Sequence, residues 1–261
     1  MTLPPATEAV ERPLGERPTA VRYVVLIALA LAAANAYLTR VLSAAATTIQ
    51  RDFQIGDEDM GYVLAGFAFG YFWFQVPGGW FANWFGSRRA LPAMSVVWSL
   101  CTFWSSLASS GFELRCSRIA VGLAQAGLVP CCAKVLADWF PDRERGIAGG
   151  AVACSMQIGA LVASGLTAIL LPRVGWRVAL GGYSALGILW AVIFYLWFRN
   201  RPEEHWSTNW AERDLIRVAR ASPSQPRPAT PLVTDTKTLL LTMLTSGSLW
   251  AVCCQIGRAH V

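Results

Sequence analysis

The sequence predicts an all-α membrane protein whose first six helices form one bundle. Three observations indicate this fold class. The chain has 261 residues, of which 54% are hydrophobic and only 15% charged, whereas a soluble domain carries about 25% charged residues. Its mean hydropathy of +0.41 is too high for a globule in water. The apolar residues also gather in runs of about 20 or more, the length that crosses a bilayer as a helix.

Each predicted span is free of acidic residues, although the chain contains 16 Asp and Glu. We expect membrane spans at about residues 22–48, 60–82, 90–110, 115–137, 146–171 and 177–198. These spans divide the chain into a tail (1–20), a six-helix bundle (21–198), a polar Pro-rich linker (199–237), and the start of a seventh helix (238–255). The last six residues, 256–261, do not continue that helix. We interpret them as a tail foreign to the natural protein, the alternative being a genuine polar C-terminus.

The distribution of basic residues predicts the orientation in the membrane. Of the 22 Lys and Arg residues, 14 lie in alternate segments that begin with the N-terminal tail and include the linker. Because Lys and Arg are enriched in cytoplasmic loops, the N-terminus and the linker are predicted to be cytoplasmic. The same bias accounts for the pI near 9.1. The basic residues therefore predict no nucleic-acid partner, and the expected partner is the lipid bilayer.

One loop motif and several span motifs resemble a known family. Residues 77–89, PGGWFANWFGSRR, resemble the major facilitator signature G-x-x-x-D-R-x-G-R-R. The residues that correspond to it are Gly79, Gly86, Arg88 and Arg89, with Asn83 at the position of the Asp.

The stretch 118–145, together with Gly175-Trp176-Arg177 and the Tyr37-Leu38-Thr39-Arg40 motif, is similar to the anion:cation symporter branch of that superfamily. This resemblance implies the N-terminal six-helix bundle of the major facilitator fold, in a bacterial inner membrane. It also implies alternating-access transport of a small organic anion, such as a sugar acid or aromatic acid. Six helices followed by a linker and a further helix are typical of a transporter with two six-helix halves. We therefore expect a C-terminal half in the full-length chain.

Two arginines inside predicted spans are the main candidates for a binding site. Arg40 and Arg118 each cost free energy in the membrane unless they are paired or hydrated. The functional interpretation is that both bind an anionic substrate through charge-assisted hydrogen bonds. The alternative is a purely structural pairing with backbone carbonyls.

Spacing and resemblance extend the candidate site to four more residues. Gln125 lies two helical turns after Arg118 on the same face. Tyr71 and Gln75 are four residues apart, and they match a Tyr and a Gln that line the cavity in the family. Tyr37 belongs to the same family motif as Arg40. For Gln75, ordinary inter-helix hydrogen bonding is an equal alternative.

Two departures from the family pattern bear on energy coupling. Proton-coupled members carry acids where this chain has Thr39 and Gln125, and neither residue can exchange a proton near neutral pH. We therefore expect anion transport without proton symport through these positions, with exchange or sodium coupling as alternatives. In the loop signature, Asn83 and Trp84 replace the family's Asp and Arg, which weakens an inter-helix ion network. A non-transporting membrane sensor on the same scaffold is the rival hypothesis.

Catalysis finds no support in the sequence. The chain contains two histidines, His205 and His260, and no motif of a metalloprotease, a serine hydrolase or a phosphate-binding loop. The sequence therefore predicts a protein that is not an enzyme and needs no cofactor or metal.

Overall fold

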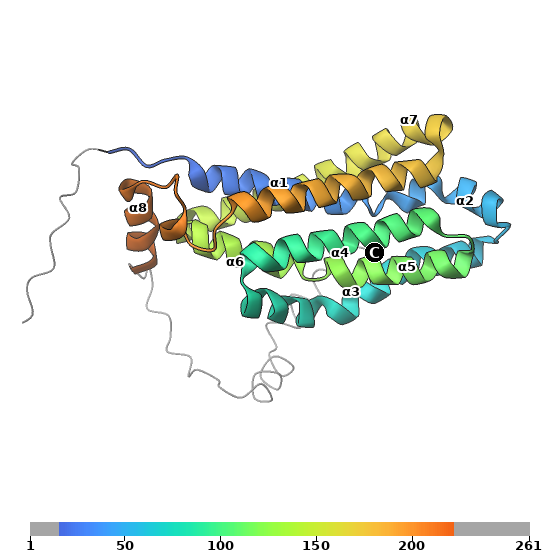
Figure 1. Ribbon diagram of the computed structural model, residues 1–261, viewed down its shortest axis with the longest axis horizontal. Coiled ribbons are helices and arrows are strands. Elements are labelled where there is room, and N and C mark those ends of the chain that lie inside the picture. Colours follow the sequence, from blue (N-terminus) through green and yellow to red (C-terminus); the bar gives the residue numbers. More distant parts are fainter. Residues whose placement is uncertain (1–15, 222–261) are drawn as a thin grey trace, which may run out of the picture. The chain divides into compact units, whose positions relative to one another are not determined.

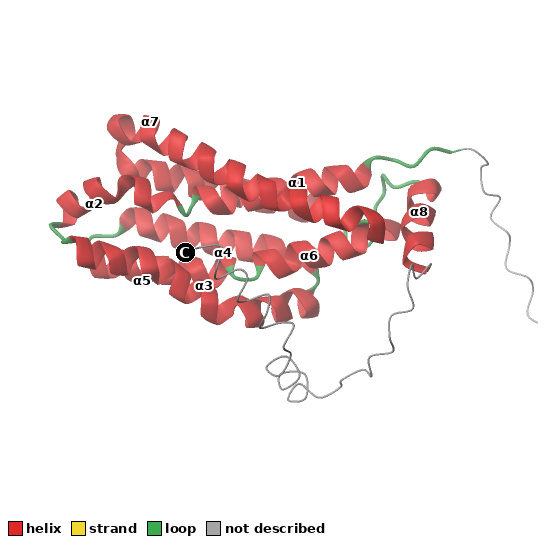
Figure 2. Ribbon diagram, turned by 180° about the vertical axis from the view of Figure 1, so that it is seen from behind, coloured by secondary structure: helices red, strands yellow, loops and turns green. Residues whose placement is uncertain are grey.

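The computed structural model describes residues 16–221, and every regular element in that range is a helix (Figures 1 and 2). In chain order these are α1 (Val21–Leu38), the 3₁₀-helix η1 (Val41–Ala45), α2 (Ala46–Phe53), α3 (Asp57–Phe85), α4 (Ser87–Leu107), α5 (Gly111–Gln125), α6 (Leu128–Trp139), α7 (Asp142–Trp197), the 3₁₀-helix η2 (Pro202–Glu204) and α8 (Trp210–Ala221). The predicted seventh helix, the residues after it and most of the N-terminal tail lie outside the described residues.

The helices reproduce the six predicted spans, but two spans are broken. Among the described residues, four helical stretches are long and apolar enough to cross a membrane: Val21–Phe53, Ser87–Leu107, Gly111–Trp139 and Asp142–Trp197. The first stretch is interrupted after α1 and the third between α5 and α6. The span predicted at 60–82 lies within α3.

The 56 residues of α7 contain two of the predicted spans, joined at Gly175. Gly175 has φ 76° and ψ 166°, a conformation open to glycine and strained for other residues, so the chain reverses direction there. The reversal brings Trp176 and Arg177 to Asp52, whose Oδ2 accepts hydrogen bonds from Trp176 Nε1 (2.8 Å) and Arg177 Nη1 (3.2 Å). This contact gives the Gly-Trp-Arg motif a structural role.

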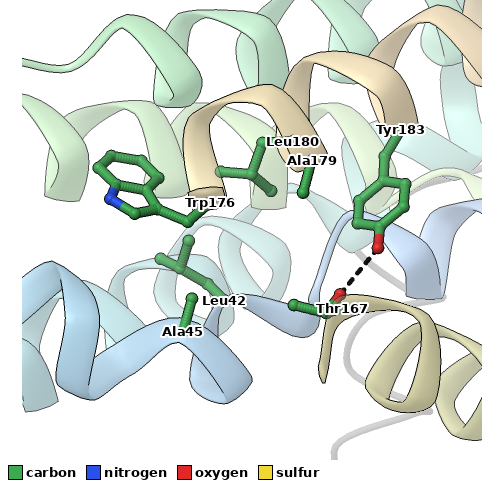
Figure 3. Close-up of a pocket in the computed structure, with 7 residues that line it drawn as sticks. All are labelled: Leu42, Ala45, Thr167, Trp176, Ala179, Leu180 and Tyr183. Carbon is green, nitrogen blue, oxygen red and sulfur yellow. Dashed lines mark hydrogen bonds between the residues drawn. The ribbon is translucent and has the colours of Figure 1, made fainter. Parts of the chain in front are cut away.

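A small cavity lies near this turn (Figure 3). Its walls come from η1 and both arms of α7, and the hydroxyls of Thr167 and Tyr183 hydrogen-bond across it at 2.8 Å. With a volume of about 10 Å³, the cavity has room for about one water molecule. It is too small for an organic ligand.

Two apolar clusters pack the ends of the bundle and leave a polar layer between them. One cluster includes Leu29, Trp98 and Trp139, and the other includes Leu42 and Leu114. Along the first span, the buried residues of the first cluster end at Ala36 in α1, and those of the second begin at Leu42 in η1. The polar residues between them are buried, and they include Thr39, Arg118 and Gln125.

Helix α8, which the linker contributes, lies across the end of the bundle where α1 begins (Figure 1). Its Glu212 is fully buried and accepts a hydrogen bond from the backbone N–H of Arg22 at 3.1 Å. The Arg22 guanidinium forms ion pairs with Glu212 (3.5 Å) and with Glu144 at the start of α7 (3.2 Å). Glu212 therefore fixes the beginning of the linker to α1 and α7.

The segment before α8 is anchored by His205, which is fully buried. Its ring lies 4.7 Å from that of Trp197 and 5.6 Å from that of Trp139, measured between centroids. Nδ1 accepts a hydrogen bond from the N–H of Ser207, whereas Nε2 has no partner among the described residues. Burial, together with the charge of Arg199, lowers the pKa of His205, so the neutral imidazole is the form that fits this position.

Candidate functional site

The candidate site is built on the break in the first span. Helix α1 ends at Leu38, and the backbone hydrogen bonds that follow span fewer residues than in an α-helix. Arg40 N–H donates to the carbonyl of Tyr37 (3.1 Å), and Leu42 N–H donates to that of Arg40 (2.8 Å). The carbonyls of Ala36 and Thr39 are thereby released from the α-helical pattern. Backbone carbonyls freed within a membrane helix need other donors, because no water is available in the hydrocarbon.

Gln125, the last residue of α5, supplies one of these donors. Its Nε2 donates to Thr39 Oγ1 at 2.7 Å and to the carbonyl of Ala36 at 3.3 Å. Its Oε1 accepts a hydrogen bond from Arg40 Nε at 2.9 Å. Because the amide uses its nitrogen on one side and its oxygen on the other, these contacts fix its orientation.

The Arg40 guanidinium lies among three aromatic rings. Its Cζ is 4.5 Å from the ring centroid of Tyr37, 4.6 Å from that of Phe67 and 5.2 Å from that of Tyr71. Each ring presents a face of negative potential to the cation, which favours the charged form without neutralising it. The structure thus brings Arg40, Tyr37, Tyr71 and Gln125 together, four of the six residues predicted for substrate binding.

Arg118 is buried within the helix bundle. It is only 2% exposed. Its Nη1 donates to the carbonyl of Thr39 at 2.9 Å, and its Cζ lies 5.7 Å from the Phe67 ring centroid. Its Nε has no hydrogen-bond partner among the described residues. The bond to the Thr39 carbonyl supports a structural role for this arginine. The unused Nε–H supports a role in binding an anion.

Neutral groups hold both guanidiniums. Their partners are an amide oxygen, a backbone carbonyl and aromatic rings. Within residues 16–221, Arg22, Arg145, Arg177 and Arg217 form ion pairs with carboxylates, and neither Arg40 nor Arg118 does. The polar layer consequently retains a net positive charge.

Glycines explain how the helices approach closely enough to build this layer. A Cβ on Gly122 of α5 would lie 2.1 Å from the carbonyl oxygen of Phe67, and one on Gly70 of α3 would lie 2.2 Å from that of Ile119. Gly66, where a Cβ would lie 3.3 Å from the carbonyl oxygen of Arg115, and Gly70 thus form a contact strip on α3 that faces α5.

Glycine and proline residues also lie at the break between α5 and α6. Gly127 lies against Gly78, where a Cβ would come within 2.7 Å of the Gly127 Cα. Pro130, three residues further on, has no N–H to donate to the preceding turn.

Gln75 lies apart from this network. It is exposed on α3, one turn beyond Tyr71. A pocket of about 210 Å³ between α3, α4 and α5 is also separate, because its lining is apolar and includes neither arginine.

The loop signature forms a tight corner between α3 and α4. Gly86 is the single residue between the two helices, with φ 73°. The Asn200 side chain packs against Gly86 and its Oδ1 accepts a hydrogen bond from the Arg88 N–H at 2.9 Å. Of the two neighbouring glycines, Gly78 makes the close helix contact, whereas a Cβ on Gly79 would meet Pro130 at an ordinary 3.5 Å. Asn83 and Arg89 are exposed.

Sequence reasoning missed Phe67 and the backbone carbonyl of Thr39. Phe67 could have been found from its spacing, because it lies four residues before Tyr71 and hence on the same helical face. The freed carbonyl of Thr39 could not be predicted, because neither Gly nor Pro lies near Thr39 in the sequence to indicate a break in the helix.

Comparisons with known proteins agree in their outcome. The family model described as the Major Facilitator Superfamily matches residues 25–257. A "Probable galactarate/D-glucarate transporter" of Escherichia coli is 30% identical over 197 residues, which cover 70% of this chain and 43% of that protein. The galacturonate transporter of Dickeya chrysanthemi is 29% identical over 181 residues, covering 69% of this chain and 52% of the relative.

Among solved structures, a bacterial homologue of the human lysosomal transporter Spinster, in an inward-facing and unoccupied conformation, superposes with a TM-score of 0.67. Its sequence is 22% identical, and the match covers 89% of this chain and 51% of that one. The likeness therefore concerns the fold alone. The chain spans about half the length of the curated relatives it matches.

Proposed function

Because this chain belongs to the major facilitator superfamily, we propose that it is the N-terminal part of a transporter that moves a small organic anion by alternating access. It is an integral, multi-pass membrane protein with the all-α fold predicted from the sequence, and the family is one of transporters, not enzymes. The class of anion, the energy coupling of transport and the orientation of the chain in the membrane are proposed below.

One observation carries the proposal: the guanidinium of Arg40 is held in the polar layer by neutral partners. An arginine stays protonated under ordinary conditions, and a buried charge with no counter-ion is costly. A ligand carboxylate would supply that counter-ion. The names of the relatives support this class of substrate, because they describe transporters of galactarate, D-glucarate and galacturonate.

The hydrogen bonds of Arg40 restrict how a carboxylate can bind. Gln125 already accepts from Nε, so a ligand carboxylate would bind end-on at Nη1 and Nη2. Tyr37 and Tyr71 flank the guanidinium and offer hydroxyls to a sugar acid. Gln75, exposed one turn further along α3, would meet the ligand from the same helix as Tyr71. Arg118 would provide the second positive charge behind the ring of Phe67.

The neutral pair Thr39 and Gln125 supports transport without a co-transported proton at these positions. Both side chains are neutral and engaged in hydrogen bonds, so neither can take up or release a proton near neutral pH. Exchange of one anion for another, or coupling to sodium, is compatible with this arrangement. We place the N-terminus and the linker in the cytoplasm of a bacterial inner membrane, on the basis of the distribution of basic residues.

Uptake of radiolabelled anion into liposomes that contain the complete protein tests the proposal. We expect uptake of galactarate or galacturonate, loss of uptake in Arg40→Ala, and normal uptake in Arg115→Ala. Arg115 is the matched control, since it is an exposed arginine one turn before Arg118 on the same helix. Binding without uptake would instead indicate a sensor, for which the exposed Asn83 and Trp84 at the altered loop signature are the motivation.

A further inference from the structure

We propose that Phe67 is a positioning residue of the anion site, whose ring holds the guanidinium groups of Arg40 and Arg118 in place without neutralising either. This inference rests on the proposed function. The ring centroid lies 4.6 Å from the Cζ of Arg40 and 5.7 Å from the Cζ of Arg118. It therefore lies within cation–π distance of both charges.

The backbone contact between α3 and α5 determines where this ring lies. The Phe67 carbonyl oxygen would be 2.1 Å from a Cβ on Gly122, so the two helices touch at that level. Gly66 and Gly70, on either side of Phe67 in the sequence, face Arg115 and Ile119 of α5. The close contacts on both sides of Phe67 therefore fix its backbone against α5, at the level of the two arginines.

A second aromatic contact fixes the plane of the ring. Phe67 stacks on Tyr71, one turn further along α3, with centroids 5.8 Å apart and an interplanar angle of 29°. Tyr71 also lies beside the Arg40 guanidinium, 5.2 Å from its Cζ. The cation therefore rests against two stacked rings, with Tyr37 beside it at 4.5 Å.

The choice of an aromatic residue has an electrostatic consequence. Two like charges close together repel each other, and this repulsion grows where the effective dielectric constant is low. A carboxylate side chain of the protein between the two arginines would relieve the repulsion. It would also neutralise the positive charge that attracts the anionic ligand. The quadrupole of a ring attracts both cations and carries no net charge, so the pair stays available to an anion.

Removing the ring should loosen both arginines and weaken anion binding. Because Phe67→Leu removes the cation–π contacts to both arginines, we expect it to weaken galactarate binding roughly tenfold. Phe67→Tyr keeps the ring and should bind almost normally. Phe69→Leu is the matched control, because Phe69 is an exposed phenylalanine on the same helix, 61% accessible.

A series of fluorinated phenylalanines at position 67 separates positioning from packing. Fluorine withdraws electron density from the ring face and changes its size little, so a purely structural role would leave affinity unchanged along the series. We expect the affinity of the complete protein for galactarate to fall stepwise from phenylalanine to the mono-, di- and trifluorinated residues. Equal affinities along the series, or an unweakened Phe67→Leu, would overturn the inference.

Parallel measurements on Arg40→Ala distinguish this inference from the proposed function. If Arg40→Ala abolishes binding while the fluorinated series is flat, Phe67 has no positioning role and the anion site stands. If Arg40→Ala binds normally, the anion site itself is wrong and the inference fails with it.

Discussion

Gln125 Nε2 donates a hydrogen bond to Thr39 Oγ1 over 2.7 Å, so the two neutral residues at which the sequence predicts the absence of proton coupling are bonded to each other. The same amide accepts from Arg40 Nε through its oxygen. A neutral bridge thus links α1 and α5 and orients the arginine. The pair forms a hydrogen-bonded contact without an ionisable group of its own.

The first prediction concerns a carboxylate at this bridge. In Gln125→Glu, an ionised carboxylate would pair with Arg40 and repel an incoming anion, so galactarate affinity should fall at high pH and recover as the Glu protonates. The unmodified protein should bind with nearly constant affinity between about pH 5.5 and 8, a range in which neither Thr39 nor Gln125 titrates. Ligand affinities of both proteins across this range are the measurement. Steep pH dependence in the unmodified protein would contradict the account.

The second prediction concerns the attachment of the linker helix. Glu212 is buried against Arg22, and breaking a buried ion pair by removing one partner costs about 3 kcal/mol or more. Glu212→Ala should therefore lower the thermal stability of the purified protein markedly, whereas the exposed Glu203→Ala should have little effect. Equal melting temperatures for the two variants would show that α8 is not fixed in this way.

The third prediction follows from His205. Its pKa in the folded protein lies below the ordinary value, because burial among Trp139 and Trp197 disfavours the imidazolium and Arg199 and Arg213 add positive charge nearby, against the opposing charge of Glu212. The released segment binds the proton more readily than the docked one, so docking is fully favourable above about pH 6.5 and weakens as the pH falls through the folded pKa.

Hydrogen exchange of the α8 amides measures this effect. Exchange caused by release of α8 should rise below about pH 6.5 relative to the helices of the bundle. His205→Gln is the control, because it cannot titrate. A wild-type profile identical to that of His205→Gln would rule out a role for the histidine.

The fourth prediction tests the orientation. Asn83 and Ser109 are exposed near opposite ends of α4 and can be replaced singly by Cys in a background without native cysteines. A membrane-impermeant thiol reagent added to intact cells should label Ser109→Cys and not Asn83→Cys. The reverse pattern would place the N-terminus outside.

Hydropathy alone predicted most of the fold, because long acid-free apolar runs have few alternatives to membrane helices. The break after α1 could not be predicted in this way. It depends on side-chain donors from α5, Gln125 and Arg118, that reach the carbonyls of Ala36 and Thr39 from distant parts of the sequence. The close contact at Gly78 was likewise indistinguishable from one at Gly79 until the position of Gly127 was known.

The site could be predicted in part, because a charged residue inside a membrane span costs free energy unless it has a partner or a function. Arg40 and Gln125 were identified from the sequence, and the structure brings them within 2.9 Å of each other. The depth of Arg118 and the role of Phe67 depend on how α3 packs against α5, which no single motif encodes.

We propose above all that Arg40 and Arg118, which no carboxylate of the polar layer neutralises, bind the anion. The most direct test of this claim is the equilibrium affinity of the complete protein for galactarate or galacturonate, compared among the unmodified chain, Arg40→Ala, Arg118→Ala and the control Arg115→Ala. Charge-assisted hydrogen bonds predict that each of the two site variants loses affinity by about a hundredfold or more, while the control binds normally. Unchanged affinity in Arg40→Ala and Arg118→Ala would contradict the claim.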